Sequence, residues 1–136
     1  MGLSELKALS SCLAENNDVK NLKKRSGNMV KAGEEFYLYY KVANIAYKQA
    51  SGAPCDLKLA VKKMGKVLIE VPMGYGNILA ASPQHQDQVL ESFQNAVRFK
   101  FSPETAPGVY NVVLTFKDVN ADKTVDITYP VTVSKP

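Results

Sequence analysis

His85 is the single histidine of the chain, so it is the first residue to test for catalysis. A hydrolase triad needs a histidine held by a carboxylate, with a nucleophile beside it. Asp87 and Ser82 lie near His85 in the sequence, but no G-x-S-x-G motif presents a serine at a sharp turn. We therefore predict an exposed histidine in a polar loop, no catalytic residues and no enzymatic activity.

Metal ligands are sparse as well. One histidine and two distant cysteines do not supply the clustered ligands of a structural zinc site. The stretch Asp118-Val119-Asn120-Ala121-Asp122 offers oxygen ligands at alternating positions, but it lacks the glycine and glutamate that an EF-hand loop requires. Hairpin-turn chemistry also favours Asp and Asn, and a weak calcium contact is the alternative. We predict no metal and no cofactor.

The two cysteines allow two interpretations. If paired, Cys12 and Cys55 would close a loop of about 40 residues and stabilise the fold by about 4 kcal/mol. If unpaired, they are two small buried hydrophobic residues. We favour the unpaired state slightly, because Cys12 lies in a segment that need not pack tightly on the rest of the chain.

Two tyrosines are candidates for binding a partner. Hydrophobicity alternates from Phe36 onward, so Tyr37 and Tyr39 share the face opposite Phe36, Leu38 and Tyr40. If the latter face is core, the two tyrosines stand outside the sheet, where tyrosine supplies apolar area with a polar tip. A cross-strand ladder that covers the sheet explains them equally well.

A third tyrosine lies among glycines. The stretch Met73-Gly74-Tyr75-Gly76 predicts a surface loop and is too short to cradle a phosphate. Loops often carry function, so Tyr75 is a candidate for stacking on a sugar or on a protein partner.

Alternating hydrophobicity predicts the strands that must position these residues. It occurs in 36–42, 57–61, 67–71, 97–101, 110–116 and 125–133. Met64-Gly65 reads as a turn, Pro72 is expected to end a strand, and residues 73–95 fit either a short helix or a strand. About seven short strands separated by turns favour a sandwich or barrel, and one wet face on each strand favours two packed sheets.

The N-terminal segment shows a different period. Leu3, Leu6, Leu9 and Leu13 are spaced by three and four residues, which predicts a short amphipathic helix over 3–14. The basic stretch from Lys20 to Arg25 is expected to be a solvated linker. We therefore divide the chain into an N-terminal helix with a basic linker, 1–29, and an Ig-like β-sandwich domain, 30–136.

Charge and length exclude several classes of protein. A chain of 136 residues with 46% hydrophobic residues fits one domain. The net charge of +4 divides into +3 for residues 1–33, with six basic and three acidic residues, and +1 for the remainder, with 11 and 10. The predicted sandwich therefore lacks the basic footprint of a nucleic-acid-binding domain. No apolar run is long enough to span a membrane.

The N-terminus also lacks the pattern of a signal peptide, because Glu5 and Lys7 interrupt it. We expect a periplasmic or extracellular protein if a signal peptide was removed, and a cytoplasmic protein otherwise.

The C-terminal hairpin, 108–134, carries the clearest strand pattern. Pro130 has no amide to donate, so its strand is expected at or near a sheet edge. A free edge can accept a strand from another chain, and self-association there is one predicted interaction.

The same region resembles a known family. Phe101-Ser102-Pro103, Ala106-Pro107-Gly108-Val109-Tyr110 and Val131-Thr132-Val133 resemble the final strands of bacterial extracytoplasmic Ig-like or fibronectin-like modules. The stretch from Ala32 to Asn44 resembles their entry strand. The resemblance covers 30–134 and implies an adhesive, spacing or partner-binding role without catalytic residues.

These observations predict an all-β fold, an immunoglobulin-like antiparallel two-sheet sandwich with a short N-terminal helix. The predicted function is a non-enzymatic module for protein interaction or cell-envelope architecture, with another protein or a second copy as partner. The alternative is a carrier that holds a small apolar ligand between its two sheets, with 73–95 as a lid.

Overall fold

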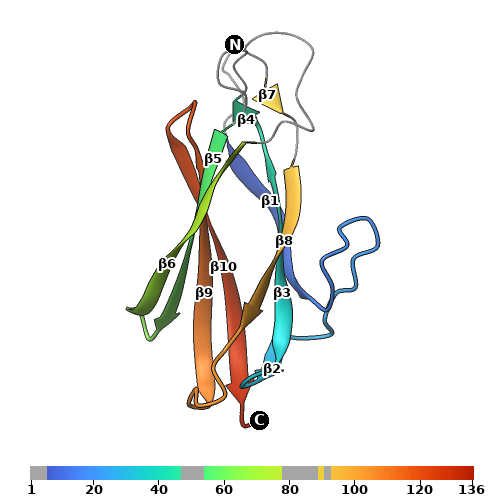
Figure 1. The fold of residues 1–136 in the computed structure, drawn as a ribbon, viewed down its shortest axis with the longest axis vertical. Coiled ribbons are helices and arrows are strands. Elements are labelled where there is room, and N and C mark those ends of the chain that lie inside the picture. The colour runs from blue at the N-terminus through green and yellow to red at the C-terminus, as the bar shows by residue number, and fades with distance from the viewer. Residues whose placement is uncertain (1–5, 47–53, 78–88, 91–92) are drawn as a thin grey trace.

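Strands dominate the chain in the computed structural model, which describes residues 6–46, 54–77, 89–90 and 93–136. No helix occurs in this part of the chain (Figure 1). The strands are β1 (Lys7–Ala14), β2 (Met29–Lys31), β3 (Glu35–Ala43), β4 (Ile45–Ala46), β5 (Pro54–Lys63), β6 (Lys66–Asn77), β7 (Val89–Leu90), β8 (Phe93–Lys100), β9 (Gly108–Asp118) and β10 (Lys123–Ser134).

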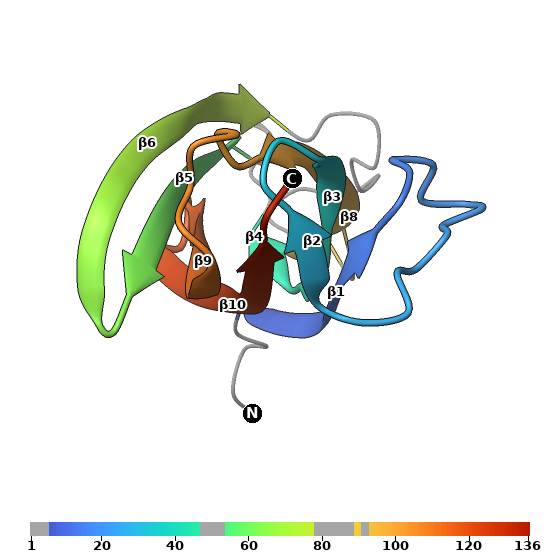
Figure 2. The same ribbon diagram turned by 90° about the horizontal axis from the view of Figure 1, so that it is seen from below.

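The strands form two main sheets that face each other. The smaller sheet has the order β1-β3-β8, the larger has the order β2-β10-β9-β5-β6, and β4 and β7 form a separate pair. Viewed from one end, the sheets enclose the core, and β6 curves along the outer edge of the larger sheet (Figure 2). All pairings are antiparallel except that of β2 with the last residues of β10. The predicted two-sheet sandwich is thereby confirmed.

Alternating residues of the central strands build the core, as their sequence pattern predicts. Each strand sends every second side chain between the sheets, because successive side chains of a strand point to opposite faces. The buried members are Phe36, Leu38, Tyr40 and Val42 of β3, Tyr110, Val112, Leu114 and Phe116 of β9, and Ile127, Tyr129, Val131 and Val133 of β10.

The predicted N-terminal helix is wrong, because the segment forms β1 and pairs with β3. Leu6 and Leu13 are both buried in the core, seven residues apart. A spacing of seven returns to the same face of a helix, whereas in a regular strand it would switch faces. The register of β1 shifts between Ala8 and Ser10, so Leu9 is an extra residue that restores the face. The leucine spacing therefore fits a bulged strand as well as a helix.

Of two expectations that rest on prolines, the one for Pro72 is wrong and the one for Pro130 is confirmed. Pro72 was expected to end a strand, yet β6 continues to Asn77. A proline is tolerated there because β6 is the edge strand of the larger sheet. Pro130 lies in the strand next to the opposite edge, since β2 pairs outside β10 along Thr132–Ser134.

The interval 73–95, for which helix and strand were both open, contributes strands wherever it is described. It holds the end of β6, the short β7 and the start of β8. Residues 78–88, including His85, lie outside the described residues, so the prediction for that histidine stays a prediction.

Candidate ligand-binding cleft

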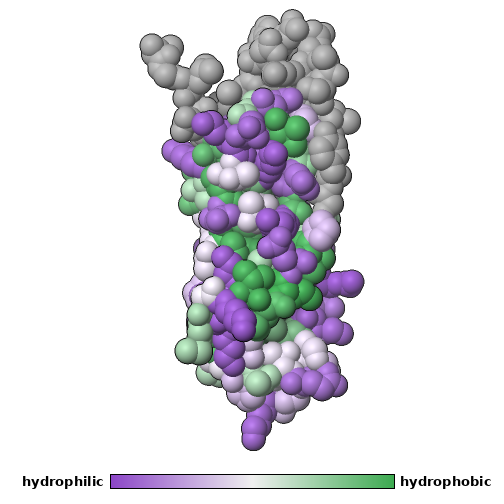
Figure 3. Space-filling model, turned by 90° about the vertical axis from the view of Figure 1, so that its left-hand side faces the viewer, coloured by the Kyte–Doolittle hydropathy of each residue, from purple (hydrophilic) through white to green (hydrophobic). Residues whose placement is uncertain are grey.

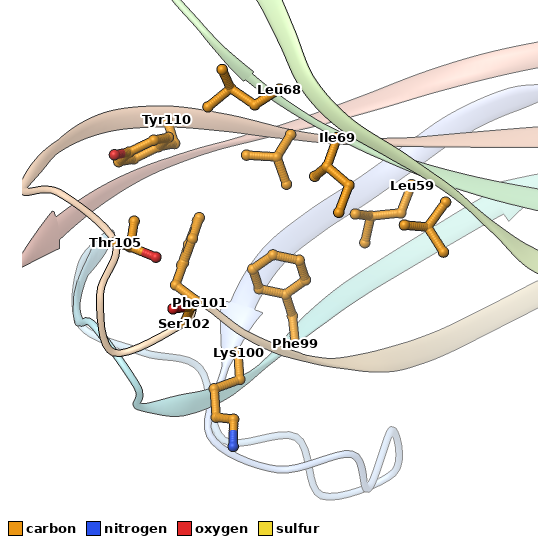
Figure 4. Close-up of a pocket in the computed structure, with 11 residues that line it drawn as sticks. Leu59, Leu68, Ile69, Phe99, Lys100, Phe101, Ser102, Thr105 and Tyr110 are labelled. Carbon is orange, nitrogen blue, oxygen red and sulfur yellow. The ribbon is translucent and has the colours of Figure 1, made fainter.

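An apolar cleft of about 410 Å³ opens between the two sheets. It lies where β6, the edge of the larger sheet, faces the end of β8, the edge of the smaller one. Volumes of about 300–1,000 Å³ are usual for small-molecule sites. The lining residues are Leu59, Val61, Leu68, Ile69, Val71, Phe99, Lys100, Phe101, Ser102, Thr105 and Tyr110 (Figure 4).

The floor of the cleft is a packed aromatic and aliphatic surface. Phe101 stacks edge-on against Phe99 with ring centroids 4.9 Å apart, and its ring lies 5.4 Å from that of Tyr110. Leu59 and Val61 of β5 are buried and complete this surface. Interlocked rings hold one another in place, so the floor is a preformed surface.

The opposite wall is exposed to solvent. Leu68 and Ile69 of β6 are 54% and 53% exposed, and Val71 and Met73 are exposed as well. Figure 3 shows a hydrophobic patch bordered by hydrophilic side chains on the side of the molecule where β6 lies in Figure 1. Scattered exposed apolar residues are ordinary, but a contiguous set beside a cavity is typical of a binding site.

The backbone of β6 explains why this wall stands away from the core. The β5–β6 register shifts twice, between Leu57 and Lys58 and between Val61 and Lys62. The second shift leaves Leu68 without a partner across the strand pair, since Val61 pairs with Ile69 and Lys62 with Val67. Bulges bend the strand that carries them and increase its twist. The result is an edge strand that curves past the smaller sheet rather than closing on it.

Polar groups lie only at the rim. Ser102 donates a hydrogen bond to the Glu104 carboxylate, and this bond lowers the pKa of Glu104. Tyr110 donates its hydroxyl to the Ala106 carbonyl at 2.6 Å, so its ring alone faces the cleft. The Lys100 side chain runs away from the apolar side chains in Figure 4. The interior therefore offers apolar contact without a charged group.

The predicted binding residues Tyr37, Tyr39 and Tyr75 do not meet in this cleft. Tyr37 is half-buried and its hydroxyl donates to Glu35 at 3.4 Å. Tyr39 is buried and donates to the Gln94 side chain at 2.9 Å, so it offers little surface to a partner. Tyr75 lies within β6, opposite Asp56, and not in a loop.

Two further tyrosines place hydroxyl groups in the interior. Tyr129 donates to the Tyr39 carbonyl at 2.8 Å across the sandwich. Burial raises the pKa of Tyr40 to about 12, although a hydrogen bond with Asn95 acts in the opposite direction. Burial also raises the pKa of Tyr129 above its usual range. Both side chains are therefore neutral at physiological pH and act as structural groups.

The acidic loop after β9 behaves as a turn. Asp118 is fully buried, and its carboxylate accepts hydrogen bonds from the Ala46 amide at 2.7 Å and the Ala121 amide at 3.3 Å. Asp122 pairs with Lys117 at 3.5 Å. Within the described residues, no three or more His, Cys, Asp and Glu side chains cluster as a metal site would need. Turn chemistry thus accounts for the oxygen ligands that the sequence suggested.

Cys12 and Cys55 carry thiols and are not joined in a disulfide. Cys12 lies in β1 of the smaller sheet and Cys55 in β5 of the larger sheet. Burial raises the pKa of the Cys12 thiol, which lowers its reactivity.

Comparison with known proteins supports the fold. No family model and no curated protein matches the chain. Among solved structures, a Niemann-Pick type C2 protein from the Japanese carpenter ant is similar, with a TM-score of 0.57, 11% identity, and 98% of this chain and 96% of that chain covered. The alkylpurine DNA glycosylase AlkC of Pseudomonas fluorescens matches with a TM-score of 0.56 and 11% identity, over 96% of this chain and 31% of that chain.

At such low identity the similarity shows the fold alone, an Ig-like β-sandwich. The finer resemblance, to bacterial extracytoplasmic modules, stays a prediction. No membrane-spanning helix is present in the described part of the chain.

The sequence allowed an apolar ligand between the two sheets as an alternative, but it did not identify the residues that line the cleft, although one signal was available. Val67-Leu68-Ile69 places three apolar residues in succession at the start of β6. A strand with one buried face should alternate, so such a run indicates a bulge or a second apolar surface.

Proposed function

We propose that this chain is a non-enzymatic binding module that holds a small apolar molecule in the cleft between β6 and β8. The observation that carries the proposal is the asymmetry of the cleft, with a packed aromatic floor on one side and a half-exposed aliphatic wall on the other. Leaving this wall in water is unfavourable, and an apolar occupant would bury it.

The chemistry of the lining narrows the occupant. Its interior has no charged group aimed at the occupant, and its three polar residues, Lys100, Ser102 and Thr105, lie at the rim. A molecule with an aliphatic or aromatic body matches this surface, whereas a highly charged metabolite would lose its hydration without replacement.

The test is a titration with a fluorescent apolar probe such as N-phenyl-1-naphthylamine. Wild type should show saturable binding. Ile69→Glu should weaken the affinity at least about tenfold, because the bound probe would strip water from a charge. Val109→Glu is the matched control, since Val109 is 58% exposed and lies outside the cleft. Equal binding by both variants would contradict the proposal.

Protein interaction through the edge of β6 is the second candidate. Its support is the free edge together with the exposed side chains of Val67 and Met73. Pro72 and the two register shifts interrupt the edge, however, and such interruptions are how proteins prevent strand addition. Sedimentation velocity over a wide concentration range decides the matter for self-association, because a strict monomer excludes it.

The proposal also includes the cellular compartment of the protein. We place the module outside the cytoplasm, on the basis of its resemblance to extracytoplasmic Ig-like modules. Fractionation of the source cells with an antibody against the protein tests this placement.

A further inference from the structure

The β5–β6 turn ends in an exposed methionine. Met64 is 96% exposed, and the two residues of the turn, Met64 and Gly65, have φ of 55° and 79°. Two-residue hairpin turns with positive φ at both positions favour Asn or Asp followed by Gly. The backbone of the turn therefore gives no reason for a methionine at its tip, and neither does packing.

Lysines surround this tip. Residues 57–69 contain Lys58, Lys62, Lys63 and Lys66 and no acidic residue. Lys58 pairs with Glu70 at 3.4 Å, but the other three form no ion pair within the described residues. The Lys63 ammonium instead lies 4.8 Å above the ring of Tyr110. Three positive charges thus flank one apolar tip.

This hairpin end is continuous with the cleft. Tyr110, which holds Lys63, also lines the cleft. Leu68 and Ile69, which form the exposed wall, lie within five residues of Met64 along the same hairpin. The cationic tip and the apolar wall therefore make up one surface, which we name the hairpin surface: Lys62, Lys63, Met64, Lys66, Leu68 and Ile69.

We infer that the hairpin surface docks on an anionic lipid membrane. Lysines that flank an apolar tip in the sequence match the interface between headgroups and acyl chains, where a lysine stem is buried and its ammonium contacts phosphate. An acidic protein would match the charges, but it would not account for a methionine at the outermost point. Docking also explains how an apolar occupant, which dissolves poorly in water, enters the cleft. This entry of an occupant rests on the proposed function, whereas the docking does not.

Vesicle co-sedimentation tests the docking. Wild type should bind vesicles of phosphatidylcholine with phosphatidylglycerol and should not bind pure phosphatidylcholine. Lys62→Gln, Lys63→Gln and Lys66→Gln combined should lower the partition coefficient on the order of a hundredfold. The matched control replaces Lys20, Lys24 and Lys31 with Gln, which removes the same charge from another region, and should lower it less than about fivefold.

Two more measurements separate electrostatics from insertion. Met64→Asn suits the positive φ of the turn, so the fold is retained, and it should weaken vesicle binding about tenfold by removing the apolar tip. Raising the salt from 0.1 M to 1 M should release wild type, because the screening length falls from about 10 Å to about 3 Å.

Two results would overturn the inference. One is no binding of wild type to anionic vesicles, even if an acidic protein is captured instead. The other is an equal loss for the hairpin and control variants, which would mean that only overall charge matters. Probe binding in vesicle-free solution, measured on wild type, tests the proposed function separately: absence of probe binding with vesicle binding intact contradicts the proposed function alone.

Discussion

Truncating a side chain on the floor of the cleft should mainly lower stability, whereas truncating one on the exposed wall should mainly weaken ligand binding. Leu68 is 54% exposed, whereas Leu59, on the floor, is 4% exposed. Leu59→Ala should therefore lower the free energy of unfolding by about 2–5 kcal/mol, as large-to-small changes in a packed core do. Leu68→Ala should lower it by less than about 1 kcal/mol, since half of the side chain already contacts water and no cavity forms.

Ligand affinity, in contrast to stability, should fall clearly when Leu68 is truncated. Full burial of a leucine stabilises by about 2 kcal/mol, so an occupant that covers the exposed half gains about 1 kcal/mol. Leu68→Ala should weaken probe affinity about fivefold, and the double change Leu68→Ala with Ile69→Ala about thirtyfold. Val109→Ala should leave affinity unchanged, because Val109 lies outside the cleft.

Urea unfolding and probe titration measure the two quantities on the same samples. If Leu68→Ala destabilises the unliganded protein as much as Leu59→Ala does, β6 closes on the core in solution and the reasoning fails. If the double variant binds the probe as tightly as wild type, the exposed wall does not contact the occupant.

Three other predictions concern the polar groups of the sandwich. Asp118→Ala should lower the free energy of unfolding by about 3 kcal/mol in urea melts, because two backbone amides lose a buried carboxylate. Tyr40 and Tyr129, whose pKa values are raised by burial, should stay protonated in the folded state. Their stabilisation is complete below pH 10 and is lost as pH rises toward 12, because only the unfolded chain releases these protons in that range. Tyrosinate absorbance, followed together with circular dichroism, should therefore stay below the value for all seven tyrosines until the protein unfolds. Hydrogen bonds from the Lys31 amide and Arg25 lower the pKa of Glu34. The contribution of Glu34 to stability is therefore complete above pH 4.5 and is lost as the pH falls below it. Glu34→Gln should reduce the dependence of the thermal melting temperature on acid pH.

Alternation of apolar residues was sufficient to predict the central strands. Strands β3, β9 and β10 bury every second residue, and their pattern is regular because one face of each contacts the opposite sheet. Turn residues added the hairpin connections, including Met64-Gly65, whose positive φ values agree with a tight turn. Short-range rules succeed at these positions because period and turn geometry are local properties of the chain.

The sequence was insufficient wherever a strand departs from regularity. The bulge at Leu9 gave β1 the leucine spacing of a helix, and only pairing with β3 distinguishes the two. Pro72 and Pro130 carry the same chemical signal, yet the outermost position belongs to β6, the strand with Pro72, since strand order depends on contacts between distant segments. The cleft also depends on contacts between distant segments, because it lies between the edge strands of two different sheets.

Composition and period thus determined a two-sheet β-sandwich with an apolar interior. Tertiary structure decided which apolar residues remain uncovered. Leu68 and Ile69 look like core residues in the sequence, but two shifts of register bend their strand away from the smaller sheet and leave them half-exposed beside a packed aromatic floor. Register between strands is set by the summed packing of both sheets, and no local pattern encodes it.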